Sequence, residues 1–269
     1  MSEAVGMQNH ERGQVIADAA RIYEDFFVPA LFGQWPEQVL DLAAVRPGHR
    51  VLDVGCGTGV LSRAALRRTG PTGRVAGVDP NVGMLAVARE TATAVDWQAG
   101  FAEELPFESG SFDRVVSQFA AMFFWDRERA FAEMARVLST NGTAAVVTWA
   151  SLEETPGYAA LAELLDEVVG GDAVEALRSP FSLGQADDLH RLMSVAFSDV
   201  TVERHEGTAV FASIDDWIHT EIRGWTLAGS IGDDEFAEVL RLAHMRLGRF
   251  AESGRVSFPA PALMAVTRR

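Results

Sequence analysis

Short apolar segments alternate with amphipathic ones through residues 45–150. Segments rich in Val, Ala and Leu predict five strands, at 50–55, 74–79, 95–100, 112–118 and 143–150. Between them, segments such as 126–138 carry apolar residues at helical spacing, and Asp126 can cap that helix. An Asn141-Gly142 turn is expected to separate this helix from the fifth strand. Strands and helices alternating at this spacing predict an α/β fold with a doubly wound parallel sheet.

The pattern changes after residue 150. Residues 157–169 and 186–197 predict helices, 198–205 predicts a strand, and 262–269 predicts a last strand. Residues 15–44 also have helical spacing. We therefore expect three parts: an N-terminal helical lid over 1–44, an α/β core over 45–150, and a C-terminal part over 151–269. The last part would complete the sheet and carry helical cap insertions at 151–195 and 206–257.

Charge and composition narrow the class of partner. The formal net charge is −15, and no basic run is longer than a pair such as Arg67-Arg68. Nucleic-acid binding depends on basic side chains at phosphates, so neither nucleic acid nor an anionic membrane is expected as partner. The apolar run 119–125 is too short to span a membrane. The N-terminus has no signal-peptide pattern and Cys56 is the single cysteine, so we expect a cytoplasmic protein.

The stretch VLDVGCGTGVLSR, residues 51–63, runs from a strand into glycines at every second position. Such a loop brings backbone close to a ligand, although it also occurs where packing is merely tight. A dinucleotide fingerprint needs GxGxxG, but Val60 stands at the sixth position, and a phosphate loop needs a lysine that is absent here. Asp53 would repel a pyrophosphate and attract an amino group or a sulfonium.

Asp79 ends the second predicted strand, 24 positions after Gly55. A carboxylate at that place can accept hydrogen bonds from both ribose hydroxyls. It could instead serve only as an acidic residue near the start of the next helix. Together with the glycine loop, Asp79 favours a nucleoside ligand.

Four motifs in order resemble those of class I S-adenosylmethionine-dependent methyltransferases, especially the ubiquinone/menaquinone-biosynthesis type of small-molecule methyltransferase. They are VLDVGCGTG, VAGVDPNVGMLAVAR, AEELPFESGSFDRVVS and RVLSTNGTAAVVTW, and they cover roughly residues 45–150. The resemblance implies a Rossmann-like, seven-stranded, mostly parallel sheet whose last strand is antiparallel. It also implies S-adenosylmethionine as cofactor, with S-adenosylhomocysteine as product.

The resemblance implies a set of cofactor-binding residues. Asp53 would lie near the amino group of the methionine moiety, Asp79 would hold the ribose, and Met84 would pack on the adenine. The full set is Tyr23, Asp53, Gly55, Cys56, Gly57, Thr58, Gly59, Asp79, Pro80, Asn81, Met84, Gly100, Phe101, Ala102, Glu103, Gln118 and Phe119.

The chain departs from the family at two places. Phe101 stands where the family often has an Asp that contacts the adenine, so Glu103 or main-chain groups would replace that contact and Phe101 would stack. The turn LSTNG replaces the usual Pro-Gly-Gly, a change we expect to be structural. Cys56 is not expected to be a nucleophile, because no histidine is placed by the sequence to activate it.

The acceptor is expected against the ends of the fourth and fifth strands, beneath the lid and cap. The candidate substrate residues are Phe27, Met122, Phe123, Trp149, Tyr158, Trp217 and His219. Their aromatic, Met-rich character favours an apolar or aromatic small molecule. No catalytic residue is identified; the weak candidates are His219, Gln118 and Tyr23. The sequence leaves open the methylated atom (O, N, C or S) and a homodimer.

Two other functions stay open. One is a non-catalytic S-adenosylmethionine-binding regulatory or partner protein, which the motifs do not exclude. The other is a nicotinamide oxidoreductase, which Val60 and Asp53 disfavour. No HExxH-type spacing occurs, so no metal is expected.

Overall fold

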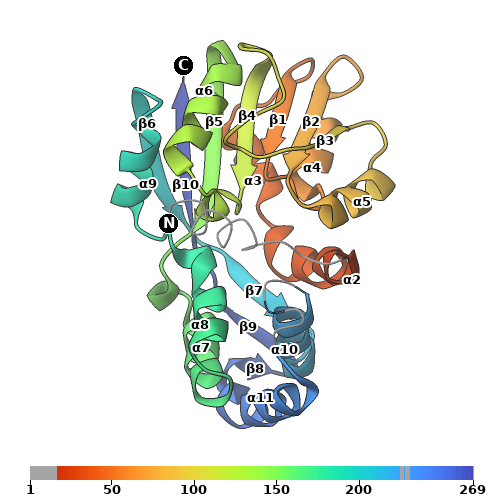
Figure 1. The fold of residues 1–269 in the computed structure, drawn as a ribbon, viewed down its shortest axis with the longest axis vertical. Coiled ribbons are helices and arrows are strands. Elements are labelled where there is room, and N and C mark those ends of the chain that lie inside the picture. The colour runs from red at the N-terminus through yellow and green to blue at the C-terminus, as the bar shows by residue number, and fades with distance from the viewer. Residues whose placement is uncertain (1–16, 225–226, 228–230, 269) are drawn as a thin grey trace, which may run out of the picture.

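The computed structural model describes residues 17–224, 227 and 231–268 of the 269-residue chain. A large sheet with helices on its faces fills the upper part of the molecule, and a smaller cap lies below it (Figure 1). The short helix α2 (Ala17–Ile22) lies beside the boundary between the two parts. The three-part division expected from the sequence stays a prediction, and residues 1–16 of the expected lid lie outside the described residues.

The large sheet has seven strands in the order β3-β2-β1-β4-β5-β10-β6. Their bounds are β1 Arg50–Val54, β2 Arg74–Asp79, β3 Asp96–Ala99, β4 Phe112–Gln118, β5 Leu138–Trp149, β6 Asp199–His205 and β10 Ala262–Arg268. Strands β1 to β5 pair in parallel, while β10 lies antiparallel between β5 and β6. The predicted sheet, including its antiparallel last strand, is confirmed.

Helices cover this sheet. They are α3 Pro36–Leu42, α4 Val60–Thr69, α5 Val82–Thr91, α6 Arg127–Val137 and α9 Ala186–Met193. The π-helix η1 Tyr23–Phe32 and the short 3-10 turn η2 at Ala121–Phe123 lie at the carboxyl ends of the strands. Because helices cover both faces, central strands are apolar on both sides: Val51, Leu52 and Val54 of β1 are fully buried. Asp126 caps α6 as predicted, its Oδ1 accepting the N–H of Arg129 at 3.1 Å.

The expected turn at Asn141-Gly142 does not separate α6 from β5. Helix α6 ends at Val137, and β5 begins at the next residue. The pairing of β5 with β4 moves from Phe112↔Leu138 to Arg114↔Thr143, so β5 spends extra residues over this step. Asn141 has φ +65 within it. The turn signal therefore marks an irregularity inside the strand, because Leu138 already pairs with β4.

The cap joins segments from the second half of the chain. Its helices are α7 Pro156–Val168, α8 Gly171–Arg178, α10 Ile214–Arg223 and α11 Asp233–Arg246, with 3-10 turns η3 Leu152–Glu154, η4 Ser179–Phe181 and η5 Gly248–Phe250. A three-stranded antiparallel sheet of order β7-β9-β8 completes it, with β7 Thr208–Phe211, β8 Ala251–Glu252 and β9 Arg255–Pro259. The sequence did not predict this sheet, whose strands are short and whose β7 lies far along the chain from the β8–β9 hairpin.

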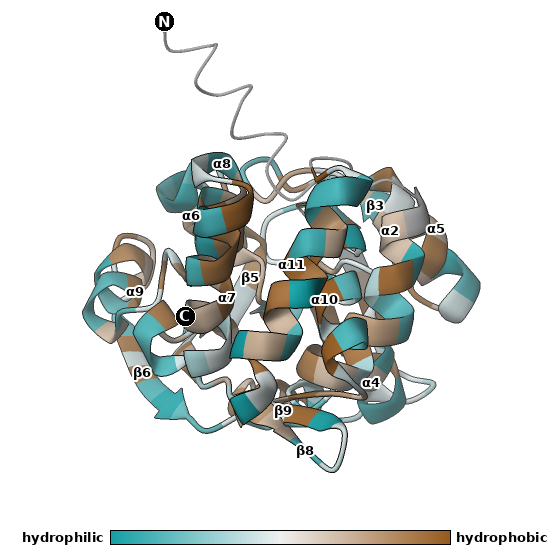
Figure 2. Cartoon of the chain, turned by 90° about the horizontal axis from the view of Figure 1, so that it is seen from below, coloured by the Kyte–Doolittle hydropathy of each residue, from teal (hydrophilic) through white to brown (hydrophobic). Residues whose placement is uncertain are grey.

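The cap has its own aromatic core. Seen from the cap side, its helices show hydrophobic and hydrophilic residues in alternation, as amphipathic helices do (Figure 2). The ring of Trp217 on α10 lies 4.8 Å from that of Phe258 and 5.9 Å from that of Phe211. The cap is thus packed onto itself as well as onto the sheet.

Candidate functional site

A cavity opens at the carboxyl ends of β1, β2 and β4, which we call the cofactor cavity. It is lined by residues of the glycine loop, of the loops after β2, β3 and β4, and by Tyr23 of η1. All the residues predicted to bind the cofactor line it except Gly59 and Asn81. The lining residues that the prediction omitted from its cofactor set are Val60, Leu61, Val78, Ala120, Phe123, Phe124 and Trp125.

The two exceptions have structural roles. Gly59 is the first residue before α4 and has φ +90; a Cβ there would lie 2.5 Å from the indole of Trp97. Asn81 caps α5, its side-chain oxygen accepting the N–H groups of Gly83 and Met84. Gly57 differs: its φ is +54, and a Cβ there would meet no atom within 4 Å. Gly57 is therefore the glycine that exposes backbone to a ligand.

The carboxylates of Asp53 and Asp79 are buried at this cavity, and the two residues are 1% and 9% exposed. Ser62 Oγ donates to Asp53 Oδ2 at 2.6 Å. Asp79 accepts the N–H of Gly57 at 2.9 Å and the N–H of Asn81 at 2.8 Å. The carboxylate of Asp79 thus joins the end of β2 to the glycine loop and fixes the loop.

Burial sets the protonation of both groups. It raises the pKa of Asp53 to about 7, with the nearby charge of Asp79 adding to the rise and the Ser62 hydrogen bond opposing it. Burial also raises the pKa of Asp79 to about 6, against the hydrogen bonds from Asn81 and Gly57. No basic side chain lines the cavity among the described residues. Two desolvated carboxylates without a counter-ion favour a cationic ligand.

Two neutral polar side chains at the cavity each have one oxygen without a hydrogen-bond partner. Thr58 Oγ1 and Gln118 Oε1 are buried and have no hydrogen-bond partner in the structure. Gln118 Nε2 reaches the carbonyl of Phe32 only at 3.4 Å. A buried polar atom without a partner costs about 1–3 kcal/mol, so a polar ligand in this cavity would relieve that cost.

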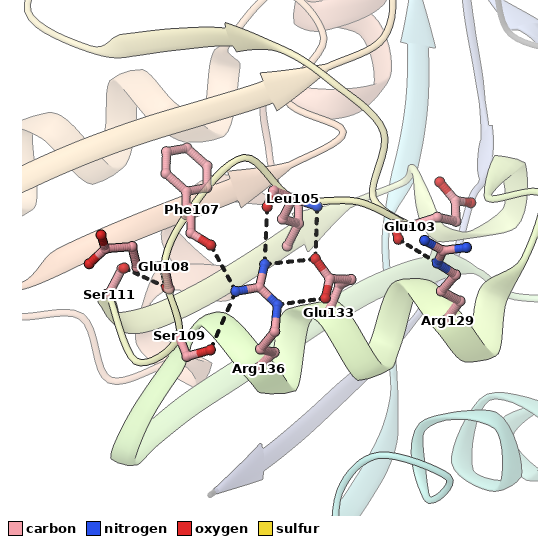
Figure 3. Close-up of polar contacts among 9 residues, drawn as sticks. All are labelled: Glu103, Leu105, Phe107, Glu108, Ser109, Ser111, Arg129, Glu133 and Arg136. Atoms are coloured by element: carbon pink, nitrogen blue, oxygen red, sulfur yellow. Dashed lines mark hydrogen bonds and ion pairs between the residues drawn. The ribbon is translucent and has the colours of Figure 1, made fainter.

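Helix α6 holds the loop between β3 and β4, as Figure 3 shows. Arg136 forms an ion pair with Glu133 and donates to the carbonyl of Leu105 at 3.0 Å. Glu133 accepts the N–H of Leu105 at 2.9 Å, and Arg129 Nε donates to the carbonyl of Glu103 at 2.8 Å. These contacts fix the part of the cavity edge that comes from this loop.

The side chain of Glu103 serves the protein backbone. Its Oε1 accepts the N–H of Trp125 at 2.9 Å and that of Asp126 at 3.3 Å, and the residue is 2% exposed. The sequence predicted that Glu103 would replace the adenine contact of the family's Asp. In the structure its Oε1 bonds to the segment after β4. Phe101 lies at the cavity and is 42% exposed.

The π-helix η1 covers the cavity. Its Tyr23 lines the cavity and stacks on Phe32 with ring centroids 5.0 Å apart. Arg63 of α4 ties η1 to the glycine loop, because it pairs with Glu24 at 2.6 Å and donates to the carbonyl of Thr58 at 2.7 Å. Tyr23 of η1 thus lies at the cavity, while a lid formed by the N-terminal segment stays a prediction.

An aromatic wall closes the cavity on the β4 and β5 side. Phe119 directly follows β4 with φ +54, a left-handed conformation that costs a residue with a Cβ about 1–2 kcal/mol. Its ring stacks on Trp149 at the end of β5, with centroids 3.7 Å apart and planes at 12°. Phe32 packs on both rings, at 5.5 and 5.8 Å.

A second, small cavity lies behind this wall, which we call the cap cavity. It is lined by residues of η1, β5, the cap helices and the turn after α10, among them Leu31, Trp149, Tyr158, Phe181, Glu221 and Leu227. The predicted substrate residues Trp149 and Tyr158 meet there. The two cavities are neighbours, because the stacked rings of Phe119 and Trp149 each line one of them.

The other predicted substrate residues are spread out. Phe123 lines the cofactor cavity and, with Met122, an open groove beside it. Phe27 and Trp217 are fully buried in the core. His219 is exposed on α10, its ring 6.4 Å from that of Phe26, and it lines none of the cavities described.

Cys56 lines the cofactor cavity as a thiol. Burial raises its pKa well above the usual range, and the charges of Asp79 and Asp53 add to the rise. A protonated thiol is a poor nucleophile, in agreement with the expectation that Cys56 does not react. Over residues 17–224, 227 and 231–268, no three His, Cys, Asp or Glu side chains are grouped as metal ligands, and no helix is long and apolar enough to cross a membrane.

Comparisons with known proteins agree with this geometry. The family model described as a methyltransferase domain matches residues 51–142. A ubiquinone/menaquinone biosynthesis C-methyltransferase, UbiE, from Bordetella parapertussis is 37% identical over 149 residues, 53% of this chain and 58% of that protein. The UbiE of Xanthomonas campestris is 36% identical, over 52% of this chain and 59% of that protein. The chain thus spans less than two thirds of these relatives.

Solved structures share the fold. The YcgJ protein of Bacillus subtilis has a TM-score of 0.59 at 24% identity, covering 87% of this chain and 97% of that one. A phosphoethanolamine N-methyltransferase 2 of Haemonchus contortus, solved in complex with S-adenosyl-L-methionine, has a TM-score of 0.56 at 20% identity, covering 87% of this chain and 52% of that one. At these identities the likeness establishes the fold alone.

Proposed function

Residues 51–142 carry a methyltransferase domain of the class I S-adenosylmethionine-dependent type, and from that premise we propose that the chain transfers a methyl group to a small molecule. The proposed acceptor is largely apolar or aromatic. The name of the curated relatives, C-methyltransferase, makes carbon one candidate for the methylated atom. The family model ends at residue 142, before the cap that would select the acceptor, so the relatives' acceptor is not carried over to this chain.

The observation that carries the proposal is the pair of buried carboxylates in a cavity without basic side chains. A phosphate or pyrophosphate at the glycine loop would meet Asp53 with like charge, whereas a sulfonium and an ammonium group would be attracted. The backbone exposed at Gly57 and the unpartnered oxygens of Thr58 and Gln118 suit the amino acid end of such a ligand. S-adenosylmethionine has both cationic groups.

We assign roles to the lining residues accordingly. Asp79 would accept the ribose hydroxyls, since each of its oxygens has a further lone pair beside the bonds from Gly57 and Asn81. Asp53 would attract the amino group of the methionine moiety, and Met84 and Phe101 would flank the adenine. When bound, the cofactor supplies the methyl group on its sulfonium.

The chain contributes alignment more than acid–base chemistry. Transfer from a sulfonium is an in-line displacement, so holding the two reactants in contact and excluding water supplies most of the acceleration. Tyr23 and the aromatic wall would exclude water from the reacting groups. Burial and nearby carboxylates raise the pKa of Tyr23, which makes it a poor base, and His219 lies away from the cavity. Gln118 is left as a neutral hydrogen-bond acceptor.

Two measurements test the proposal. Calorimetry should show that the protein binds S-adenosylmethionine and S-adenosylhomocysteine; absence of binding of both would overturn it. Incubation with methyl-labelled cofactor and a metabolite extract should move label into a small molecule. Binding without any labelled product from any extract would favour the non-catalytic partner protein, an alternative to which the comparisons lend no support. Cytoplasmic location and a homodimer stay predictions of the sequence.

A further inference from the structure

The cap cavity contains an acid that the proposed transfer of a methyl group does not use. Tyr158 of α7 donates its hydroxyl to Glu221 Oε1 of α10 at 2.5 Å. The two residues are 5% and 3% exposed. They lie 63 positions apart in the sequence, so the contact joins two cap helices across the interior. A buried carboxyl is costly unless something nearby compensates it.

No positive side chain compensates Glu221. Burial raises its pKa to about 8, the neighbouring donors Tyr158 and Trp217 oppose this rise, and no charged neighbour contributes. The titratable groups that face the pair are Tyr158 itself from α7 and, beyond it, Tyr23 from η1. Neither carries positive charge. Across the described residues, no ion pair includes Glu221.

Three aromatic side chains line the cap cavity beside Glu221. Trp149, Tyr158 and Phe181 contribute aromatic rings, and the rings of Tyr158 and Phe181 lie 5.6 Å apart. Ring faces attract cations, and the attraction grows when the site is shielded from water. The carboxyl, the phenol oxygen and the ring faces can each attract a cation, and aliphatic side chains make up the remainder of the lining.

The cavity also lies close to where a methyl acceptor would bind. Trp149 lines it and stacks on Phe119, which lines the cofactor cavity. Leu31 of η1 lines it too, and the same helix brings Tyr23 to the cofactor cavity. The two cavities therefore lie on either side of one pair of stacked rings.

We propose that the cap cavity binds a small organic ammonium group carried by the methyl acceptor, with Glu221 as its counter-ion, Tyr158 holding the carboxylate and the surrounding rings flanking the cation. This inference rests on the proposed function and narrows its acceptor to an otherwise apolar or aromatic amine. The ammonium group would hold the acceptor in place, and which atom of the acceptor is methylated stays open. A neutral hydroxyl group would gain a hydrogen bond there, but it would gain nothing from the ring faces or from ionisation of Glu221.

The test compares n-butylammonium with 1-butanol, two probes of nearly the same shape that differ in charge. Calorimetric titrations are made on protein saturated with S-adenosylhomocysteine and on protein without it. We expect n-butylammonium to bind about tenfold more tightly than 1-butanol near pH 9, with the preference declining toward pH 6 as Glu221 takes up a proton.

Two variants and a control separate a binding role from a structural one. Glu221→Gln, which imitates the protonated acid, should reduce the preference to less than about threefold and abolish its pH dependence. Tyr158→Phe should keep the preference but move its rise to higher pH, because it removes the hydrogen bond that lowers the pKa of Glu221. Glu163→Gln, on the exposed side of α7, should change neither.

Equal binding of the two probes, or a preference that survives in Glu221→Gln, would overturn the inference. Affinity for S-adenosylhomocysteine should be the same in all the variants, which also shows that they fold. If S-adenosylhomocysteine binds neither the unmodified protein nor any variant, the proposed function fails. The titrations without it still decide whether the cap cavity prefers a cation.

Discussion

The cofactor cavity and the cap cavity both bury carboxyl groups, but their supports differ. Asp53 and Asp79 stand near the ends of neighbouring parallel strands and receive bonds from a hydroxyl and from backbone N–H groups 2 to 22 positions away in the same strand–loop–helix units. Glu221 receives its bond from a phenol on a different helix. The first site is thus a product of local strand–loop–helix geometry, and the second exists only once the cap has packed.

The largest expected difference is in the pH dependence of stability. The pKa of Glu221 is raised from 4.5 to about 8, so its contribution is fully present below pH 4.5 and is lost as the pH rises through 8. Between about pH 5 and 9, the free energy of unfolding should fall by about 4 kcal/mol more in the unmodified protein than in Glu221→Gln. Denaturant titrations measure this. Parallel curves for the two proteins would contradict it.

The glycine loop offers a matched pair of substitutions. Gly59→Ala should lower the free energy of unfolding by about 2–3 kcal/mol, since the new methyl meets Trp97 in a left-handed backbone. Gly57→Ala should lower it by about 1 kcal/mol, because the backbone is strained but the space is open. Affinity for S-adenosylhomocysteine should suffer mainly in Gly57→Ala. A larger loss of stability in Gly57→Ala, or a larger loss of affinity in Gly59→Ala, would contradict these roles.

Asp79→Ala tests the carboxylate between the glycine loop and β2. Loss of the ribose contact should weaken S-adenosylhomocysteine binding by about 1–3 kcal/mol, roughly five- to a hundredfold. Calorimetry on Asp96→Ala, an exposed acid on the neighbouring β3, is the control and should show no loss. Unchanged affinity in Asp79→Ala would remove the ribose assignment.

Arg63→Ala should have the smallest effect. It removes the ion pair with Glu24 and the bond to the Thr58 carbonyl, so η1 would cover the cavity less firmly. Partly exposed pairs of this kind contribute about 1 kcal/mol or less, so cofactor affinity should fall only about two- to fivefold. Arg67→Ala, an exposed arginine on the same helix, is the comparison. A fall as large as that of Asp79→Ala would mean that the lid, rather than the loop, dominates binding.

The sequence was most informative where function depends on neighbours along the chain. The strand ends, the glycine loop and Asp79 were predicted because strand periodicity and glycine spacing are local signals. Phe124 and Trp125 were missed as cofactor-cavity residues because an apolar run after a strand is equally typical of a core. Glu103 lines the cavity as predicted, but the bond from Trp125 N–H to its Oε1 was not foreseen, because it joins two separate loops.

By itself, then, the sequence determined the seven-stranded sheet and the methyltransferase motifs, since alternating apolar segments leave few ways to bury their faces. Only the tertiary structure decided the cap. The pairing of β7 with β9 spans two helices, and Tyr158 meets Glu221 across 63 residues, although neither residue carries a local signal for the other. Long-range contacts of this kind depend on how the cap helices pack, which no local pattern in the chain encodes.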